Sequence, residues 1–151
     1  MSDAALCGGL REAVEEILAT MFFVDCVPRA NGRHGEELIA ARVDFEGHLS
    51  GSLRLRISRR AAHLMAADFL GEEAPELPAS RTVEVVSELA NMICGAVLSR
   101  IESQTAFRLG VPLASVESGP VADPGGAGEV YQADLPGGSL WVSFGFGEGN
   151  A

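Results

Sequence analysis

Two short segments in which apolar and polar residues alternate constrain the fold of this chain more than any other feature. The first covers residues 39–46, the second covers residues 53–58, and Gly47-His48 lies in the connection between them. A period of two is typical of a strand with one face in the core and one face in water. Two such segments joined by a turn predict an antiparallel hairpin. We therefore expect a sheet with one solvated face.

Further segments extend this predicted sheet. Residues 131–135 and 140–146 alternate in the same way, and Pro136-Gly137-Gly138 supplies a turn between them. Residues 113–117 are expected to form one more strand. Two segments have the composition of loops, residues 28–35 and residues 120–128.

Three amphipathic segments predict helices. The two long ones cover about residues 10–24 and 80–102, and Ser80 is placed to cap the second. A shorter helix is expected over residues 59–70, with Ser58 as its N-cap and Gly71 at its end. Such helices bury an apolar stripe against a sheet. The expected fold class is α/β (α+β): a two-layer sandwich of two long helices and a shorter one on a mainly antiparallel sheet.

The charge and size of the chain narrow the classes of function. Its 151 residues are expected to form a single domain, with residues 1–8 and 147–151 flexible. The net charge of −10 argues against nucleic acid or an anionic membrane as the main partner. All eleven basic residues are arginine, so chemistry that needs a lysine base, Schiff base or P-loop is excluded.

The apolar runs, the N-terminus, the cysteines and the histidines of the sequence predict its localisation and its capacity to bind metals. The apolar runs are shorter than a membrane span and the N-terminus lacks a signal-peptide pattern, so we expect a cytoplasmic protein. The cysteines are odd in number and have no CxxC spacing, which predicts reduced thiols and no metal cluster. The histidines are scattered and form no metal-ligand motif. These residues are Cys7, Cys26, Cys94, His34, His48 and His63.

The helix expected over residues 80–102 carries a polar strip opposite its apolar stripe. The predicted core stripe consists of Val83, Val86, Ala90, Ile93, Val97 and Ile101. Glu84, Glu88, Asn91 and Gly95 follow one another at spacings of four, three and four on the opposite face. Met92 and Leu98 are expected to flank this strip. Glu88 and Asn91 should thus lie side by side, one turn apart and facing solvent.

Taken alone, the pair of Glu88 and Asn91 has little weight. A glutamate followed three residues later by asparagine is common on solvated helix faces. Glu84 and Glu88, four residues apart, could suggest a small enzyme that uses two carboxylates. That interpretation is weak, because two carboxylates at this spacing make neither a full metal site nor an acid/base pair without further ligands.

The chain also contains a weak internal repeat. Residues 12–22 align without gaps with residues 84–94, so that Glu16 matches Glu88. At the position of Asn91 the first copy has Ala19. Two amphipathic helices can share such a pattern by chance, so the repeat gains meaning only from the chemistry of the second copy.

The segment SELANMICG, residues 87–95, resembles the signature helix of the CheC/CheX/FliY family of chemotaxis phosphatases, whose core is Glu, two residues, Asn. The resemblance is closest to CheX-like single-domain proteins and covers about residues 10–146. It also includes Pro112 and three longer segments. These segments are residues 13–21, 45–57 and 61–71.

The resemblance implies a CheC-like fold and a phosphatase for the aspartyl phosphate of a CheY-like response regulator. In that role Asn91 would orient the attacking water and Glu88 would anchor the partner. Glu84, Met92 and Gly95 would contribute to partner binding. The protein would need no cofactor of its own, because the regulator would hold Mg²⁺. A homodimer is also implied, and Ala19 in the first copy implies one active helix, with Glu16 a surface carboxylate.

The alternative is a CheX-like interaction module that binds a response regulator or another signalling protein without catalysis. The chain departs from the family pattern at three points. It has Glu84 where Asp or Ser is usual, Ala96 where Asn often follows the glycine, and a slightly shorter spacing from Asn91 to Pro112.

Overall fold

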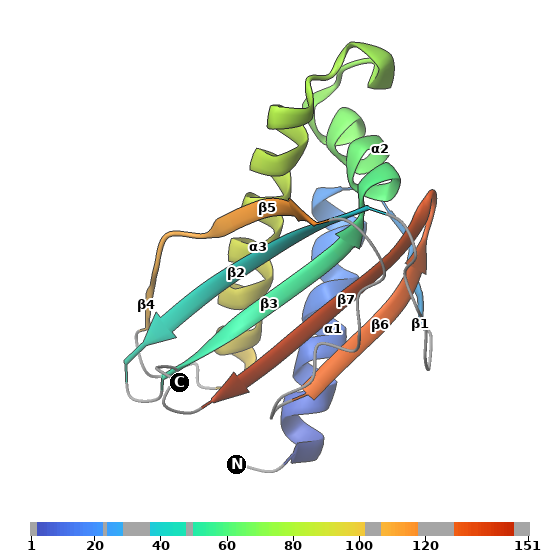
Figure 1. Ribbon diagram of the computed structural model, residues 1–151. Helices are drawn as coiled ribbons and strands as arrows, with labels where there is room; N and C mark the ends of the chain where they lie inside the picture. The colour runs from blue at the N-terminus through green and yellow to red at the C-terminus, as the bar shows by residue number, and fades with distance from the viewer. Residues whose placement is uncertain are drawn as a thin grey trace.

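One antiparallel sheet carries the fold (Figure 1). The computed structural model describes residues 3–22, 24–28, 37–47, 50–101, 107–117 and 129–146. Within these ranges the strand order is β1-β6-β7-β3-β2-β4, and β5 also pairs with β2. The strands are β1 (Val27–Pro28), β2 (Leu38–Glu46), β3 (Gly51–Ser58), β4 (Arg108–Leu109), β5 (Leu113–Glu117), β6 (Glu129–Leu135) and β7 (Gly138–Phe146).

Helices cover one face of this sheet. The described helices are α1 (Asp3–Met21), α2 (Arg59–Leu70), the short 3₁₀ turn η1 (Ala74–Glu76) and α3 (Ala79–Ile101). Helices α1 and α3 run side by side behind the sheet in Figure 1, and α2 lies near the end at which α3 begins. The buried apolar side chains of the helices and of the inner sheet face form one core. The predicted two-layer sandwich is therefore confirmed.

Both predicted hairpins are present. In the first, Ile39 pairs with Ile57 and Val43 with Leu53, so the alternating apolar residues share the buried face. In the second, Ala133 pairs with Leu140 across a turn at Pro136-Gly137. Gly137 has φ of +90°, and a Cβ at this position would lie 3.2 Å from the Cα of Ala61 in α2. A glycine is thus required here by both backbone conformation and space.

The predicted helix boundaries hold for α2 and shift for the other two. Helix α1 begins at Asp3, earlier than expected and within the N-terminal segment expected to be flexible. Helix α3 begins at Ala79, so Ser80 lies inside the helix and is not its cap. Gly71 ends α2 with φ of +69°, as its position predicted.

Ser58 stands at the N-cap position of α2, but its hydroxyl does not cap the helix. It instead accepts a hydrogen bond from the backbone N–H of Ser139 at 2.9 Å and lies 3.3 Å from the carbonyl of the same residue. The residue is fully buried, so its hydroxyl links β3 to β7 in place of the predicted cap.

The two short strands β1 and β4 were not expected. Pro28, predicted to begin a loop, pairs with Ala133 in β6. Arg108 and Leu109 of β4 pair with the end of β2. Two-residue strands contain no alternation from which a pattern could identify them. Most of the two predicted loops, together with His34 and His48, lies outside the described residues.

The strand pairing relates the two halves of the chain. Helix α1 is followed by β1 and the hairpin β2–β3, and α3 is followed by the short β4, by β5 and by the hairpin β6–β7. In each half the strand after the helix pairs with the outer strand of the other half's hairpin, and β3 meets β7 between them. Helix α2 connects the halves. The weak repeat in the sequence therefore corresponds to a repeat in the topology.

Helix α3 is long and apolar enough to cross a membrane by length and composition, with a hydropathy of 1.3 over Ala79–Arg100. The expectation that the apolar runs are too short therefore does not hold for this helix. Half of its most apolar window is buried inside the fold. Its apolar side chains serve the core between the sheet, α1 and α2.

Candidate functional site

Helix α3 presents the predicted polar strip to solvent. Glu84 and Glu88 are exposed, and Asn91 and Gly95 are partly exposed. The opposite side is buried, including Val86, Ala90, Ile93 and Val97 of the predicted stripe. The buried face is wider than predicted and also contains Val85, Leu89 and Cys94. The side chain of Ile101 lies outside the described residues.

Leu98 differs from its prediction. It was expected to flank the polar strip, but only 3% of it is exposed and it belongs to the core. Met92, the other predicted flanking residue, is partly exposed and packs against the core. Met92 therefore remains the apolar neighbour of the polar strip on the surface of α3, and Leu98 has a structural role.

Glu88 and Asn91 lie one turn apart on the same side of α3. At this spacing the Cβ atoms are separated by about 5–6 Å. Within the described part of the chain, neither side chain forms a hydrogen bond or an ion pair with another residue. The carboxylate and the amide are therefore both available to a partner.

Glu84 differs from Glu88 in this respect. Its Oε1 accepts a hydrogen bond of 2.7 Å from Nη1 of Arg81, one turn earlier in the same helix. Both side chains are exposed, so this ion pair contributes little to stability. It nevertheless neutralises the charge of Glu84 locally. Arg81 was not identified as part of this surface from the sequence, although its spacing of three residues from Glu84 is a known signal for such a pair.

Gly95 lies one turn after Asn91 and has free space around it. A Cβ built at this position meets no atom within 4 Å. Glycine in the middle of a helix is less favourable than alanine by about 0.5–1 kcal/mol. Packing within the described chain does not require a glycine at this position. The absence of a side chain at Gly95 leaves room for a molecule that approaches the Asn91 face.

The counterpart of this surface on α1 is organised differently. Glu16, which aligns with Glu88, forms an ion pair with Nη2 of Arg100 at the end of α3. Arg100 also lies 3.9 Å from Glu12. Ala19, which aligns with Asn91, is exposed. The glutamate of the first copy is thus paired with α3, in a contact between residues 84 positions apart that no local pattern could indicate.

Among the described residues, the fold raises the pKa of three groups, and none of them is exposed beside Glu88 and Asn91: Cys94 lies one turn after Asn91 but is buried, and the other two lie between α1 and β6. Burial and the nearby carboxylate of Asp44 raise the pKa of the Cys94 thiol to about 12. Burial raises the pKa of the Cys26 thiol. Burial and the hydrogen bond from the Tyr131 hydroxyl to Glu15 Oε2, 2.8 Å long, raise the pKa of Tyr131. Both thiols are free and kept protonated at neutral pH, so neither is an activated nucleophile.

The described residues do not assemble a further ligand set around the acidic strip. Among them, no three His, Cys, Asp or Glu side chains come close enough together to hold a metal ion. Glu84 and Glu88 therefore gain no third ligand from the described chain. His63 binds Thr82 and the carbonyl of Ala74 on another side of the molecule.

Comparisons with known proteins agree with this architecture. The family described as chemotaxis phosphatase CheX matches residues 39–132, more than half of the chain, and this span contains the whole of α3. No curated protein sequence matches the chain.

Several solved structures share the fold. Chemotaxis protein CheX from Vibrio vulnificus superposes with a TM-score of 0.78 at 18% identity, covering 97% of this chain and 99% of that one. CheX from Desulfovibrio desulfuricans superposes with a TM-score of 0.72 at 20% identity, covering 94% of this chain and 99% of that one. A chain of the CheX–CheY–BeF₃–Mg²⁺ complex from Borrelia burgdorferi superposes with a TM-score of 0.67 at 17% identity, covering 93% of this chain and 97% of that one. At these identities the likeness establishes a common fold.

Proposed function

The chain belongs to the CheX family of chemotaxis phosphatases, and we propose that it stimulates hydrolysis of the aspartyl phosphate of a CheY-like response regulator. The observation that carries the proposal is the pair of Glu88 and Asn91, exposed or partly exposed on a helix whose other face is fixed in the core. Both side chains lack a partner within the described chain. A pair of this kind is prepared to enter a partner's site without first breaking internal contacts.

Asn91 is assigned to orient the attacking water. Hydrolysis of a phosphoryl group depends mainly on positioning and on charge stabilisation, so a helper protein need not supply a nucleophile. An amide can donate and accept hydrogen bonds at once and does not exchange protons at neutral pH. It can therefore hold a water molecule in line with the bond that breaks. Ala90 and Ile93, before and after Asn91 in the sequence, are buried in the core and fix the position of this helix turn.

Glu88 is assigned to anchor the regulator. Its carboxylate is exposed and unpaired in the described chain, so it can accept a charge-assisted hydrogen bond from a cationic side chain of the partner. We expect that cation to be a lysine in the regulator's phosphorylation site. Such a contact would fix the register of α3 against the partner and place Asn91 above the phosphoryl group.

The metal requirement is assigned to the partner. The regulator is expected to hold the Mg²⁺ that stabilises charge on the phosphoryl group, and the chain would supply no cofactor of its own. In the Borrelia burgdorferi structure, CheX is in complex with CheY, BeF₃ and Mg²⁺. That complex supports a CheY-like protein as the partner of this chain.

Gly95 and Met92 extend the proposed docking surface beyond the reactive pair. The open space at Gly95 allows the partner's backbone or side chains to approach the helix closely. Met92, partly exposed, offers a flexible apolar contact. Glu84 is assigned a smaller part than the sequence suggested, because Arg81 already neutralises it.

Two further expectations accompany this function. The protein is expected to work in the cytoplasm, where response regulators are phosphorylated. It is also expected to form a homodimer through exposed sheet edges. Strand β5 is an outer strand, and Leu113 on it is 69% exposed, which makes this edge the one we assign to self-association.

The experiment that tests the function measures phosphate release from a phosphorylated CheY-like regulator of the same organism. A phosphatase, added in a small molar fraction of the regulator, should accelerate release through many turnovers. The alternative, a non-catalytic interaction module, predicts binding of the regulator without acceleration. Acceleration at substoichiometric amounts would exclude that alternative, and binding without it would overturn the proposed function.

A further inference from the structure

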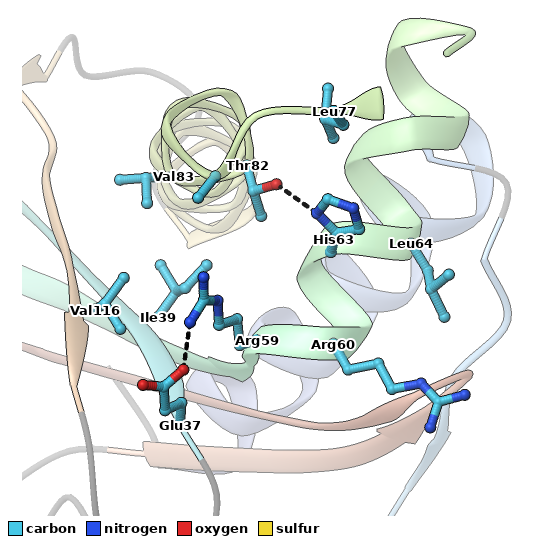
Figure 2. A pocket seen from close by; sticks show the side chains of 11 residues that line it. Glu37, Ile39, Arg59, Arg60, His63, Leu64, Leu77, Thr82, Val83 and Val116 are labelled. Atoms are coloured by element: carbon cyan, nitrogen blue, oxygen red, sulfur yellow. Dashed lines mark hydrogen bonds and ion pairs between the residues drawn. The ribbon is translucent and has the colours of Figure 1, made fainter. Parts of the chain in front are cut away.

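A cavity of about 740 Å³ lies at the start of α3, where this helix, α2 and the edge of the sheet meet (Figure 2). Strands β2 and β5 form its floor with Ile39 and Val116, and α3 contributes Val83. This volume is within the range of sites that bind small molecules. The residues that line it are Glu37, Ile39, Arg59, Arg60, His63, Leu64, Leu77, Ala79, Thr82, Val83 and Val116.

Most of the cavity surface is apolar and accessible. Ile39 and Leu77 belong to the core, and Val83 packs partly against it. Val116 is 43% exposed and Leu64 is 37% exposed, so these two large apolar side chains are left open to solvent beside the cavity. Exposed apolar groups gathered around a hollow are typical of a binding site and not of an ordinary surface.

The polar groups on the α2–α3 side of the cavity are already satisfied. Nε2 of His63 donates a hydrogen bond of 2.5 Å to the carbonyl of Ala74, because a carbonyl can only accept. In the neutral ring Nδ1 is then an acceptor, and the hydroxyl of Thr82, 3.1 Å away, donates to it. These groups hold α2, η1 and α3 together and leave recognition of a ligand to other residues.

Arg59 is the residue with unused capacity. Figure 2 shows its side chain extending between Ile39 and Glu37, with its Nη1 bound to Glu37 Oε1. A guanidinium has five N–H donors, and in the described chain this ion pair is the only polar interaction of the Arg59 side chain. Arg60 also lines the cavity, but Figure 2 shows its guanidinium pointing away from Ile39 and Arg59, so Arg59 is the cation beside the apolar floor. The cavity therefore joins an apolar floor to the N–H donors of Arg59 that Glu37 leaves unused.

We propose that this cavity binds a small amphipathic carboxylate. Its apolar body would lie against Ile39, Val83 and Val116, and its carboxylate would take the free N–H groups of Arg59. Glu37 competes for the same guanidinium and repels the ligand's charge. The site is separate from the docking surface of Glu88 and Asn91, so the proposal stands or fails independently of the proposed function.

The binding test uses octanoate as the probe, with octylammonium and octan-1-ol as controls that keep the apolar body. Titrations of the full chain are followed by the NMR methyl signals of Ile39, Val83 and Val116. Saturable shifts with octanoate, and at least about 10-fold weaker binding of both controls, are expected for a site that uses one charge-assisted contact. No saturable shift, or equal binding of octylammonium, would overturn the proposal.

A pair of variants separates recognition from structure. Arg59→Gln and Glu37→Gln remove the same exposed ion pair, so any structural effect is shared. Arg59→Gln should weaken octanoate binding about 10-fold or more, whereas Glu37→Gln should tighten it. Arg54→Gln, at an exposed arginine of β3 outside this cavity, and Asn91→Ala should leave it unchanged. If Arg59→Gln and Glu37→Gln change the affinity in the same direction, or Arg54→Gln weakens binding as much as Arg59→Gln, the assignment is wrong.

Discussion

At the scale of single residues, two glutamates one turn apart on α3 differ in what they already contact. Glu84 is bound by Arg81, and Glu88 has no partner in the described chain. A carboxylate that is free before docking can give its full charge to a new contact. One that is already paired must exchange one exposed contact for another, with little net gain. Glu88 is therefore assigned the anchoring role.

Glu88→Gln should weaken binding of the phosphorylated regulator about 10-fold or more, the loss expected for one hydrogen bond to a charged group. Glu84→Gln, the matched control, should change the dissociation constant by less than about 3-fold. Binding can be measured by fluorescence anisotropy at two salt concentrations. Equal effects of the two variants would remove the distinction that the Arg81 contact implies.

Gly95→Ala should move stability and partner binding in opposite directions. A Cβ meets no atom within 4 Å, so the substitution should stabilise the free protein by about 0.5–1 kcal/mol. The added methyl group should weaken regulator binding if the partner approaches the helix backbone here. Thermal unfolding and anisotropy measure the two effects. A stabilised variant with unchanged affinity would show that Gly95 is not part of the docking surface.

Cys94 should lower the stability of the fold at alkaline pH. The thiol ionises near pH 9 in the unfolded chain and only near 12 in the folded protein, because burial disfavours the thiolate. The unfolded state therefore releases this proton first, and stability should fall as the pH rises from about 9 towards 12. Cys94→Ala should show a shallower fall than wild type in urea unfolding across this range. Parallel curves would contradict the assignment.

At the scale of secondary-structure elements, α1 and α3 share a repeated pattern but have different contacts. Arg100 of α3 binds Glu16 and approaches Glu12, so these two carboxylates of α1 already have a cationic neighbour. The exposed face of α3 has no comparable contact at Glu88. The shared pattern therefore has a paired glutamate on α1 and an unpaired one, within the described chain, on α3.

This difference predicts that adding an asparagine at position 19 of α1 does not by itself create a second active site. In an Asn91→Ala background, Ala19→Asn restores the Glu-x-x-Asn pattern on α1 but leaves Glu16 bound to Arg100. Phosphate release should stay at the level of Asn91→Ala. Recovery of more than about a tenth of wild-type activity would show that the Arg100 contact does not silence α1.

The sequence predicted most elements because their patterns are local. Both hairpins and α2 follow from alternation, helical periodicity and turn glycines such as Gly71 and Gly137. Strands β1 and β4 could not be predicted, because two residues carry no period. Ser58 had the right type and position for a cap, but β7 provides stronger partners for its buried hydroxyl.

The candidate surface was also predicted only in part. The spacing of Glu88 and Asn91 gave their common face, since a helix repeats every 3.6 residues. The burial of Leu98 depends on tertiary packing, as does the contact of Glu16 with Arg100. The cavity at Arg59 combines α2, α3 and two strands, so no single segment of the sequence could indicate it.

At the scale of the whole molecule, β5 is an edge strand of the described sheet, and we propose it as the edge that pairs with a second copy. Strand β5 pairs with β2 on one side, and Val111 and Leu113 beside its start are 82% and 69% exposed. An edge strand with exposed apolar residues is a template for pairing. This edge also lies on the α3 side of the fold, so self-association there would set the orientation of two docking helices (Figure 1).

Leu113→Arg should therefore convert dimers to monomers in sedimentation velocity, because the charge opposes pairing of two apolar edges. Arg42→Gln, on the neighbouring strand β2, removes a charge without altering the apolar edge and serves as control. A wild-type chain that sediments as a monomer, or a Leu113→Arg variant that stays dimeric, would contradict the assignment of β5 as the dimer edge.

The most direct test of the central claim is phosphate release from the phosphorylated regulator with wild type, Asn91→Ala and Ser87→Ala. Ser87 is partly exposed one turn before Asn91 and is the matched control. Asn91→Ala should lower the stimulated rate about 10²–10³-fold, the loss expected when one preorganised contact is removed, with unfolding and regulator binding almost unchanged. Ser87→Ala should keep the wild-type rate. An Asn91→Ala variant that releases phosphate as fast as wild type would contradict the account.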